Sequence, residues 1–169
     1  MTGVADRPQP PPFSALDLDF EDANRPVISA LCWAGPGQVT VHQWLVGGDA
    51  TAARGHARAR PGVDVQAVPS LSQVAAALLE LGDEQPWVTF DQAARLAAWA
   101  AEDTTGALAV TPLLDAGELA VLVLGHVRGP SLEELLAQVE ALAGAPAPAW
   151  PAEYAPLGRA AAVATLWLT

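Results

Sequence analysis

Two aspartates in alternate positions near the start of the chain are the residues best suited to chemistry. An apolar run that begins at Phe13 leads to Asp17 and Asp19, and alternate side chains of a β-strand point to the same face, about 6–7 Å apart. Two carboxylates held that close repel each other unless a cation lies between them, and Mg²⁺ and Mn²⁺ prefer carboxylate oxygens. The pair therefore indicates the beginning of a metal site. The alternative interpretation is a strand that ends in an acidic turn, since Glu21 and Asp22 follow.

The charge balance bears on possible partners. The chain has 169 residues and a net charge of -11, from 19 acidic and 8 basic residues, and every basic residue is an arginine. Such a balance repels phosphate backbones unless a local patch overrides it. The candidate patch for single-stranded nucleic acid is Arg54, Arg58 and Arg60 with His56, which we expect in a glycine-containing loop. A solvated surface loop without a ligand is the alternative.

Composition also bounds the class of protein. A hydrophobic fraction of 51% predicts a folded domain with a sizeable core. The single cysteine, Cys32, excludes an internal disulfide and a cysteine-based zinc cluster, and its apolar surroundings predict a buried thiol. Residues 1–12 are polar and proline-rich, unlike a secretory signal, and the most apolar stretch is interrupted by charges and proline. We therefore expect a cytoplasmic protein that does not enter a membrane.

The pattern of elements predicts a mixed sheet with helices on its faces. Residues 1–12 form a disordered or extended lead, and 13–169 form one domain. Strands are expected at 13–19, 27–33 and 39–46, where the turn at 34–37 joins two of them into an antiparallel meander, and at 87–90 and 108–110. Helices are expected at about 70–82, from Asp91, at 115–124, at 131–143 and at 156–168. Strands followed by alternating helices and short strands indicate an α/β fold.

In the order of its elements and motifs, the chain resembles the DEDD superfamily of 3′-to-5′ exonucleases, which includes proofreading exonucleases. The resemblance implies a ribonuclease-H-like fold and two metal ions held by four carboxylates. The family's first motif, Asp-x-Glu on the first strand, is similar to Asp17-Leu18-Asp19, and its second is similar to Phe90-Asp91 at the start of a helix. The third motif, His-x4-Asp in a final alanine-rich helix, falls on the segment 154–159.

The third motif departs from the family pattern. Tyr154 stands where the family has the histidine that acts as general base, and Arg159 stands in place of the fourth metal-binding aspartate; Asp19 replaces a glutamate. The resemblance therefore implies an incomplete metal site at Asp17, Asp19 and Asp91. We predict an exonuclease-like domain without catalysis, a pseudoenzyme that serves as a binding or scaffolding module for a protein partner. No cofactor is expected, or Mg²⁺ or Mn²⁺ if the site is active.

Three alternatives stay open. The chain could be an active metal-dependent exonuclease on DNA or RNA in which Glu153, Asp115 or Asp22 supplies the missing ligand. It could bind nucleic acid without cleaving it. It could also be an unrelated α/β domain whose acidic positions match by chance.

Two residue types give more specific expectations. Arginine stays charged even when buried, so we predict that Arg159 forms a salt bridge with Asp17 or Asp91 in the space where a metal would bind. If a protein partner exists, exposed tryptophans such as Trp44 or Trp150 are candidate contact residues, because tryptophan is enriched in interface hot spots.

Overall fold

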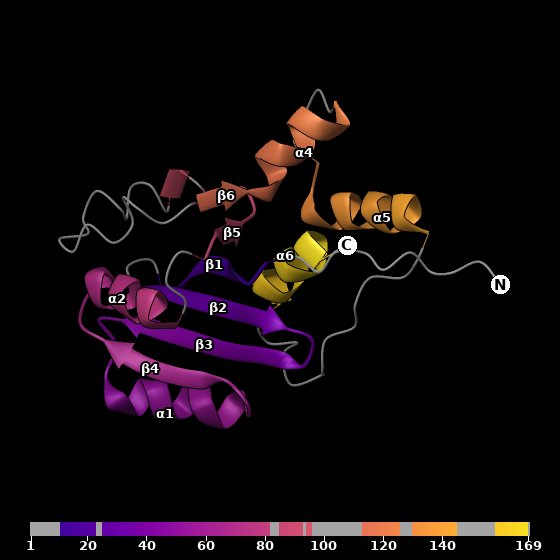
Figure 1. Cartoon of the computed structure of the whole chain (residues 1–169). Coiled ribbons are helices and arrows are strands. Elements are labelled where there is room, and N and C mark those ends of the chain that lie inside the picture. Colours follow the sequence, from indigo (N-terminus) through magenta and orange to yellow (C-terminus); the bar gives the residue numbers. More distant parts are fainter. Residues whose placement is uncertain are drawn as a thin grey trace.

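A six-stranded mixed sheet forms the centre of the described structure. The computed structural model describes residues 11–22, 25–81, 85–92, 94–95, 113–125, 130–144 and 158–168. The strands lie in the order β4-β3-β2-β1-β5-β6 (Figure 1). They are β1 (Phe13–Asp22), β2 (Arg25–Gly35), β3 (Gln38–Val46), β4 (Asp64–Val68), β5 (Trp87–Thr89) and β6 (Leu113–Asp115). The helices are α1 (Ala50–Ala59), α2 (Leu71–Leu81), α4 (Ala116–Leu124), α5 (Leu132–Ala143) and α6 (Gly158–Leu168).

The sheet confirms the α/β class and the antiparallel meander. β1 pairs with β2 and β2 with β3 in antiparallel fashion, and the turn between β2 and β3 contains Gly37 with a φ of 73°. A glycine adopts this left-handed conformation without steric cost. β5 runs parallel to β1, and β6 runs parallel to β5. The predicted strand at 108–110 lies outside the described residues, and the next described strand after β5 is β6 at Leu113–Asp115.

The segment between β3 and α2 corrects the sequence prediction. Residues 47–69 were expected to form a loop, but they contain α1 and β4, and β4 pairs parallel to β3 as a sixth strand. The expected five-stranded sheet is therefore wrong in its strand count. The helix begins at Asp49, whose carboxylate accepts hydrogen bonds from the Thr51 and Ala52 amides at 2.8 Å, as an N-cap residue does. The helix was missed because all its apolar residues are alanines, and Ala53 is its one buried residue among the described side chains.

Helices cover both faces of the sheet. On one face α2 packs against a cluster that includes Leu16, Ile28 and Trp44. On the other face α4, α5 and α6 pack against a cluster that includes Phe13 and Leu31. Figure 1 shows α1 beside β4 at one edge of the sheet and α4, α5 and α6 toward the other. Burial from both sides explains why β2 is buried without interruption from Val27 to Trp33.

Burial decides two predictions about single residues. Cys32 is buried, as predicted, and burial raises the pKa of its thiol. Trp44 is 1% exposed, so the expectation that it offers an exposed contact is wrong: it belongs to the core under α2 and stacks on the His42 ring. Trp150 lies outside the described residues. No helix in the described part of the chain is long and apolar enough to cross a membrane.

Candidate functional site

The site is built on one face of β1, beside the end of β5. Phe13, Ala15, Asp17 and Asp19 occupy every second position of β1. Phe13 and Ala15 belong to the cluster under α6. Asp17 and Asp19 therefore share one face of β1, as predicted, and it is the face that α6 covers. The Asp17 side chain is 15% exposed, whereas Asp19 is an exposed residue. The two carboxylates thus share a face but differ in their access to water.

Arg159 reaches Asp17 from the first turn of α6. Its Nε lies 3.6 Å from Asp17 Oδ1, which confirms the predicted salt bridge. Its guanidinium also donates a hydrogen bond to the Phe90 carbonyl at 3.0 Å, and its Cζ lies 5.6 Å from the centre of the Phe90 ring. The guanidinium is thus held by an ion pair, a hydrogen bond and a cation–π contact. Because 44% of the Arg159 side chain remains exposed, solvent weakens the ion pair.

Gln92 completes the surroundings of Asp17, and sequence reasoning missed it. Its Nε2 donates hydrogen bonds to Asp17 Oδ1 and to the Leu18 carbonyl, both at 2.9 Å. Its Oε1 accepts from the Leu18 amide at 2.9 Å. The side-chain amide therefore pairs with both backbone groups of Leu18, as a residue of a neighbouring strand would. The available signal was its place directly after Phe90-Asp91, at the end of a buried strand.

Asp115 ties the ends of β5 and β6 to α4. Its two carboxylate oxygens accept hydrogen bonds from four backbone amides, two in the loop after β5 and two in the first turn of α4: Asp91 at 3.0 Å, Gln92 at 3.2 Å, Gly117 at 2.9 Å and Glu118 at 3.4 Å. The predicted helix start at this aspartate is confirmed. Asp115 is 6% exposed, so the carboxylate stabilises the backbone rather than facing a ligand.

Asp91 lies at the same junction. Its backbone has a φ of 53°, the left-handed region that aspartate adopts more readily than most residues. A Cβ added at Gly117 would come within 2.6 Å of Asp91 Oδ1. The glycine therefore leaves room for the Asp91 carboxylate at the start of α4, where the helix dipole favours negative charge. The helix predicted from Asp91 lies mostly outside the described residues.

The donor groups that the structure describes do not fit a pair of hard metal ions. Among the described residues, no three carboxylate, histidine or cysteine side chains lie close enough together to hold one ion. Asp17 Oδ1 already faces Arg159 and Gln92, and both Asp115 oxygens accept backbone hydrogen bonds. A fixed cation and several hydrogen-bond donors thus take the directions that Mg²⁺ or Mn²⁺ would need.

Several predicted site residues fall outside what the structure describes. These are Tyr154 and Glu153, together with the side chain of Asp22, which ends β1. The metal hypothesis therefore stands on Asp17, Asp19 and Asp91 alone, and the role of Tyr154 stays a prediction.

Burial controls the ionisation of Asp17. Removal from water raises the pKa of this carboxyl, and the nearby Asp19 raises it further, while the Gln92 hydrogen bond and the Arg159 charge lower it. Together these effects raise the pKa of Asp17 above its ordinary value of 3.8. The folded state therefore holds the Asp17 proton more tightly than the unfolded chain does, even with Arg159 beside it.

This shift predicts how stability depends on pH. Because Asp17 binds its proton more tightly in the folded state, its contribution to stability is fully present below about pH 3.8 and is lost as the pH rises through the raised folded pKa. We expect Asp17→Asn, which keeps the acceptor for Gln92, to be at least as stable as the parent at pH 7. Urea unfolding of both proteins from pH 3 to 8 measures the difference. A variant that loses stability relative to the parent as the pH rises would contradict the assignment.

The three predicted arginines do not form one loop. Arg54 and Arg58 are exposed on α1, and Arg60 is its C-cap residue. Arg60 donates a hydrogen bond to Gln43 Oε1, and the His56 Nδ1 lies 3.3 Å from the same oxygen. The loop interpretation is therefore wrong, because these residues belong to α1 and its C-cap, while their role as a nucleic-acid patch stays a prediction.

A strip of polar side chains, formed by Asp17, Ser29 and Gln43, crosses the sheet from the site near α6 toward α1. Asp17 is the register partner of Ser29, and Ser29 is the partner of Gln43. Gln43 Nε2 donates a hydrogen bond to Ser29 Oγ at 3.0 Å, and both residues are buried. The strip depends on strand register, so the sequence gives no local signal of it.

No protein-family profile matches this sequence, and no curated protein matches it at a significant level.

Proposed function

We propose that this chain is a catalytically degenerate exonuclease-like domain of the ribonuclease-H-like fold that serves as a binding or scaffolding module. The sheet supports this fold because an antiparallel meander is followed by two short strands, β5 and β6, that run in the direction of β1. This is the arrangement that the DEDD resemblance implies. In this proposal α1 and β4 are an addition at the outer edge of β3.

The observation that carries the loss of catalysis is the contact between Arg159 and Asp17. Two-metal hydrolysis needs ions about 3.5–4 Å apart that stabilise the attacking and leaving oxygens together. Arg159 Nε lies 3.6 Å from Asp17 Oδ1, and a guanidinium cannot lose its charge in a protein. It therefore balances the carboxylate without offering a Lewis acid or a base.

A nuclease assay tests the proposal directly. We expect no degradation of 3′-labelled single-stranded DNA or RNA in millimolar Mn²⁺ above the level of the Asp17→Ala variant. The absence of the general base alone typically lowers a rate by about 10² to 10⁴. Robust degradation of these substrates by the parent protein, abolished by Asp17→Ala, would instead establish the active metal-dependent exonuclease.

Metal rescue of Arg159→Asp tests the same site without activity. This change replaces the guanidinium by a carboxylate beside Asp17, so the variant should be destabilised and Mn²⁺ should partly restore its Tm. The parent Tm should change little. Arg54→Asp is the matched control, because it makes the same charge change at an exposed position on α1. Strong stabilisation of the parent by millimolar Mn²⁺ would show that Asp17 still belongs to a metal site.

A protein is the partner that the charges favour. Arg54 and Arg58 are exposed, but the chain carries a net charge of -11, which opposes a polyanion. A titration with single-stranded DNA at two salt concentrations distinguishes a nucleic-acid partner from a protein partner, since phosphate contacts weaken steeply with salt.

A further inference from the structure

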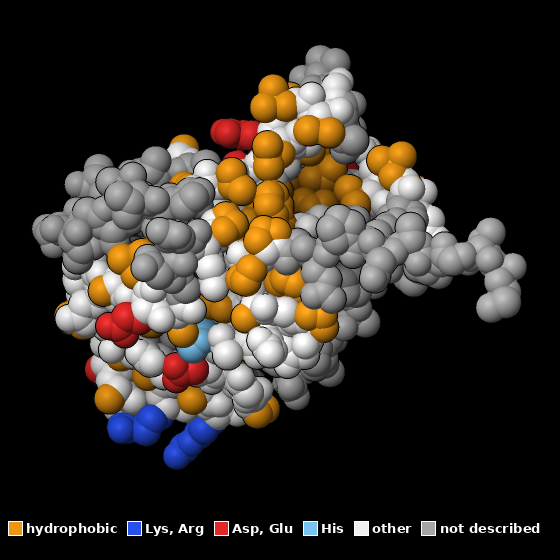
Figure 2. Space-filling model, in the orientation of Figure 1, with side chains coloured by type: hydrophobic (Ala, Val, Ile, Leu, Met, Phe, Trp, Pro, Cys, Tyr) orange, Lys and Arg blue, Asp and Glu red, His pale blue; other side chains and the backbone are white. Residues whose placement is uncertain are grey.

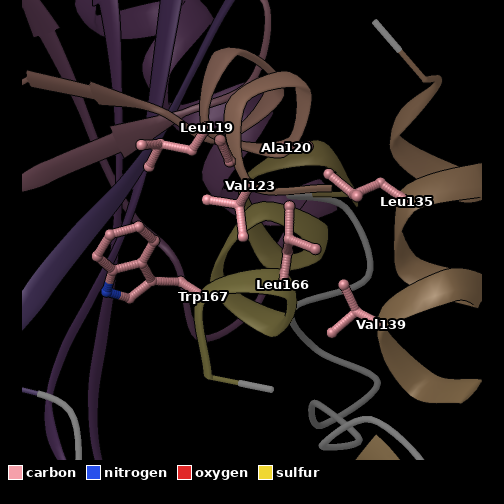
Figure 3. Close-up of a pocket in the computed structure, with 8 residues that line it drawn as sticks. Leu119, Ala120, Val123, Leu135, Val139, Leu166 and Trp167 are labelled. Atoms are coloured by element: carbon pink, nitrogen blue, oxygen red, sulfur yellow. The ribbon is translucent and has the colours of Figure 1, made fainter. Parts of the chain in front are cut away.

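An apolar groove between α4, α5 and α6 is a feature that the carboxylate site does not use. Figure 2 shows hydrophobic side chains gathered around a hollow in this part of the surface. The hollow has a volume of about 200 Å³. Its lining side chains come from all three helices and are all apolar: Ala116, Leu119, Ala120, Val123, Leu135, Val139, Leu166 and Trp167. In Figure 3 Val123, Leu135, Val139 and Leu166 surround a common space.

The groove continues onto unusually exposed apolar side chains. Val123 is 78% exposed and its neighbour Leu122 is 79% exposed, both on α4. Single exposed apolar residues are common, but a contiguous patch that leads into a groove marks an interaction site. The hydrocarbon lining selects a partner that brings apolar side chains. A helix suits it, because a helix satisfies its own backbone hydrogen bonds and presents apolar side chains along one face.

The charged side chains on these helices indicate which charge a partner would carry. The charged residues described on the three helices are Glu118, Glu133, Glu134 and Glu140, all exposed, and Arg159. Arg159 is directed to Asp17 at the other end of α6 from Trp167. The groove is therefore bordered by acidic helices, which attract basic side chains and repel a second copy of the same surface.

We propose that this groove binds an amphipathic helix of another protein, with apolar side chains at i, i+3, i+4 and i+7 and with Lys or Arg flanking them. The inference names the binding surface of the proposed scaffolding role, yet it depends on α4, α5 and α6 and not on Asp17. Apolar anchors fill the hollow between Val123 and Leu166, and the flanking cations face the acidic residues of α4 and α5. This mode is helix-in-groove recognition.

Binding of designed peptides tests the proposal. The probe is a ~16-residue helical peptide with leucines at the stated spacing and lysines on its polar face; one control peptide carries glutamates in place of the lysines, and another has the same composition in scrambled order. Isothermal titration with the full chain should show binding of the lysine peptide and at least about tenfold weaker binding of both controls. Affinity for the lysine peptide should fall as salt is added.

Two matched variants locate the binding surface. Val123→Asn should weaken binding of the lysine peptide about tenfold, because it places an amide in the hollow. Leu142→Asn changes an equally exposed apolar residue that does not line the hollow, and it should change the affinity less than about twofold. Both positions are exposed, so neither variant should unfold the protein.

Four outcomes would overturn the proposal. They are no binding of the lysine peptide, equal binding of the glutamate peptide, a concentration-dependent dimer that Val123→Asn dissociates, and binding to phosphatidylcholine vesicles that Val123→Asn abolishes. Arg54→Asp, on α1 and away from the three helices of the groove, should leave peptide binding unchanged. An active nuclease with a peptide-binding groove would therefore refute the proposed loss of catalysis alone, whereas an inactive protein without peptide binding would refute the groove alone.

Discussion

Replacing Asp115 by alanine is expected to lower the free energy of unfolding by about 3–5 kcal/mol. Its carboxylate is 6% exposed and accepts hydrogen bonds from four backbone amides, of which the Asp91 and Gln92 amides lie after β5. Hydrogen bonds to a charged group contribute about 1.5–3 kcal/mol each, and an N-cap about 0.5–2 kcal/mol, although these values do not add fully. Alanine would leave the loop after β5 and the start of α4 without their common acceptor.

Two comparisons separate this role from ordinary helix capping. Asp115→Asn should have an intermediate effect, because the amide oxygen can replace Oδ1 while its NH₂ group faces the Gln92 amide, which is also a donor. Ser131→Ala removes the capping box of α5 and should cost only about 1 kcal/mol. Chemical unfolding followed by circular dichroism measures all three variants. Equal effects of Asp115→Ala and Ser131→Ala would show that Asp115 is only a cap.

Replacing Gln92 by leucine is expected to cost about 3 kcal/mol. β5 pairs with β1 only at Ser14 and Ala15, and farther along β1 the Gln92 side chain takes over the pairing with the Leu18 amide and carbonyl. Leucine has a similar volume but offers no hydrogen bond, so it leaves two buried backbone groups and Asp17 without this partner. A buried polar group that loses its partner costs about 1–3 kcal/mol.

The Gln92→Glu variant should make the stability of the protein depend on pH. A glutamate keeps the acceptor for the Leu18 amide, but its charge faces the Leu18 carbonyl and Asp17. This environment should raise the folded pKa of the new carboxyl above its unfolded value near 4.3. The variant is therefore expected to approach parent stability below about pH 4 and to lose it as the pH rises through the folded pKa.

Gln38→Glu is the charge-matched control. Gln38 is an exposed residue at the start of β3, so its variant should follow the parent across the whole pH range. Urea unfolding of both variants at several pH values measures the difference. If Gln92→Glu also followed the parent, the side chain would have turned to solvent, and the pairing of Gln92 with Leu18 would carry little free energy.

These results bear on the proposed loss of catalysis. In an oxygen-ligand metal site the carboxylates keep lone pairs directed at the ion. Here Asp115 directs its oxygens at backbone amides, while Asp17 meets Arg159 and Gln92. The Asp17 and Asp115 carboxylates thus hold strand ends and the start of α4 together. We expect such a site to respond to mutation through stability, with metal dependence appearing only after Arg159 is replaced.

The sequence by itself determined what depends on neighbours along the chain. The turn chemistry before Gly37 predicted the antiparallel meander, and Asp115 and Ser131 predicted two helix starts. Strand alternation predicted that Asp17 and Asp19 share a face. These features follow from local backbone preferences, side-chain periodicity and hydrogen bonds between residues a few positions apart.

The resemblance and the charge of arginine predicted one long-range contact, that between Arg159 and Asp17. The structure bears this contact out, while the ribonuclease-H-like fold and the lost activity stay proposals. The predicted role of Trp44 failed because alternation tells which residues share a face, but not which face is covered: α2 buries the face on which Trp44 lies.

Only the tertiary structure decided which partners the polar side chains found. Gln92 meets Asp17 across 75 positions, and Gln43 joins Ser29 to the end of α1. These contacts arise from strand order and register, which bring distant segments together without leaving a local pattern. α1 escaped prediction for a related reason: its apolar residues are all alanines, and its place is fixed by contacts with β4 and by the Asp49 cap.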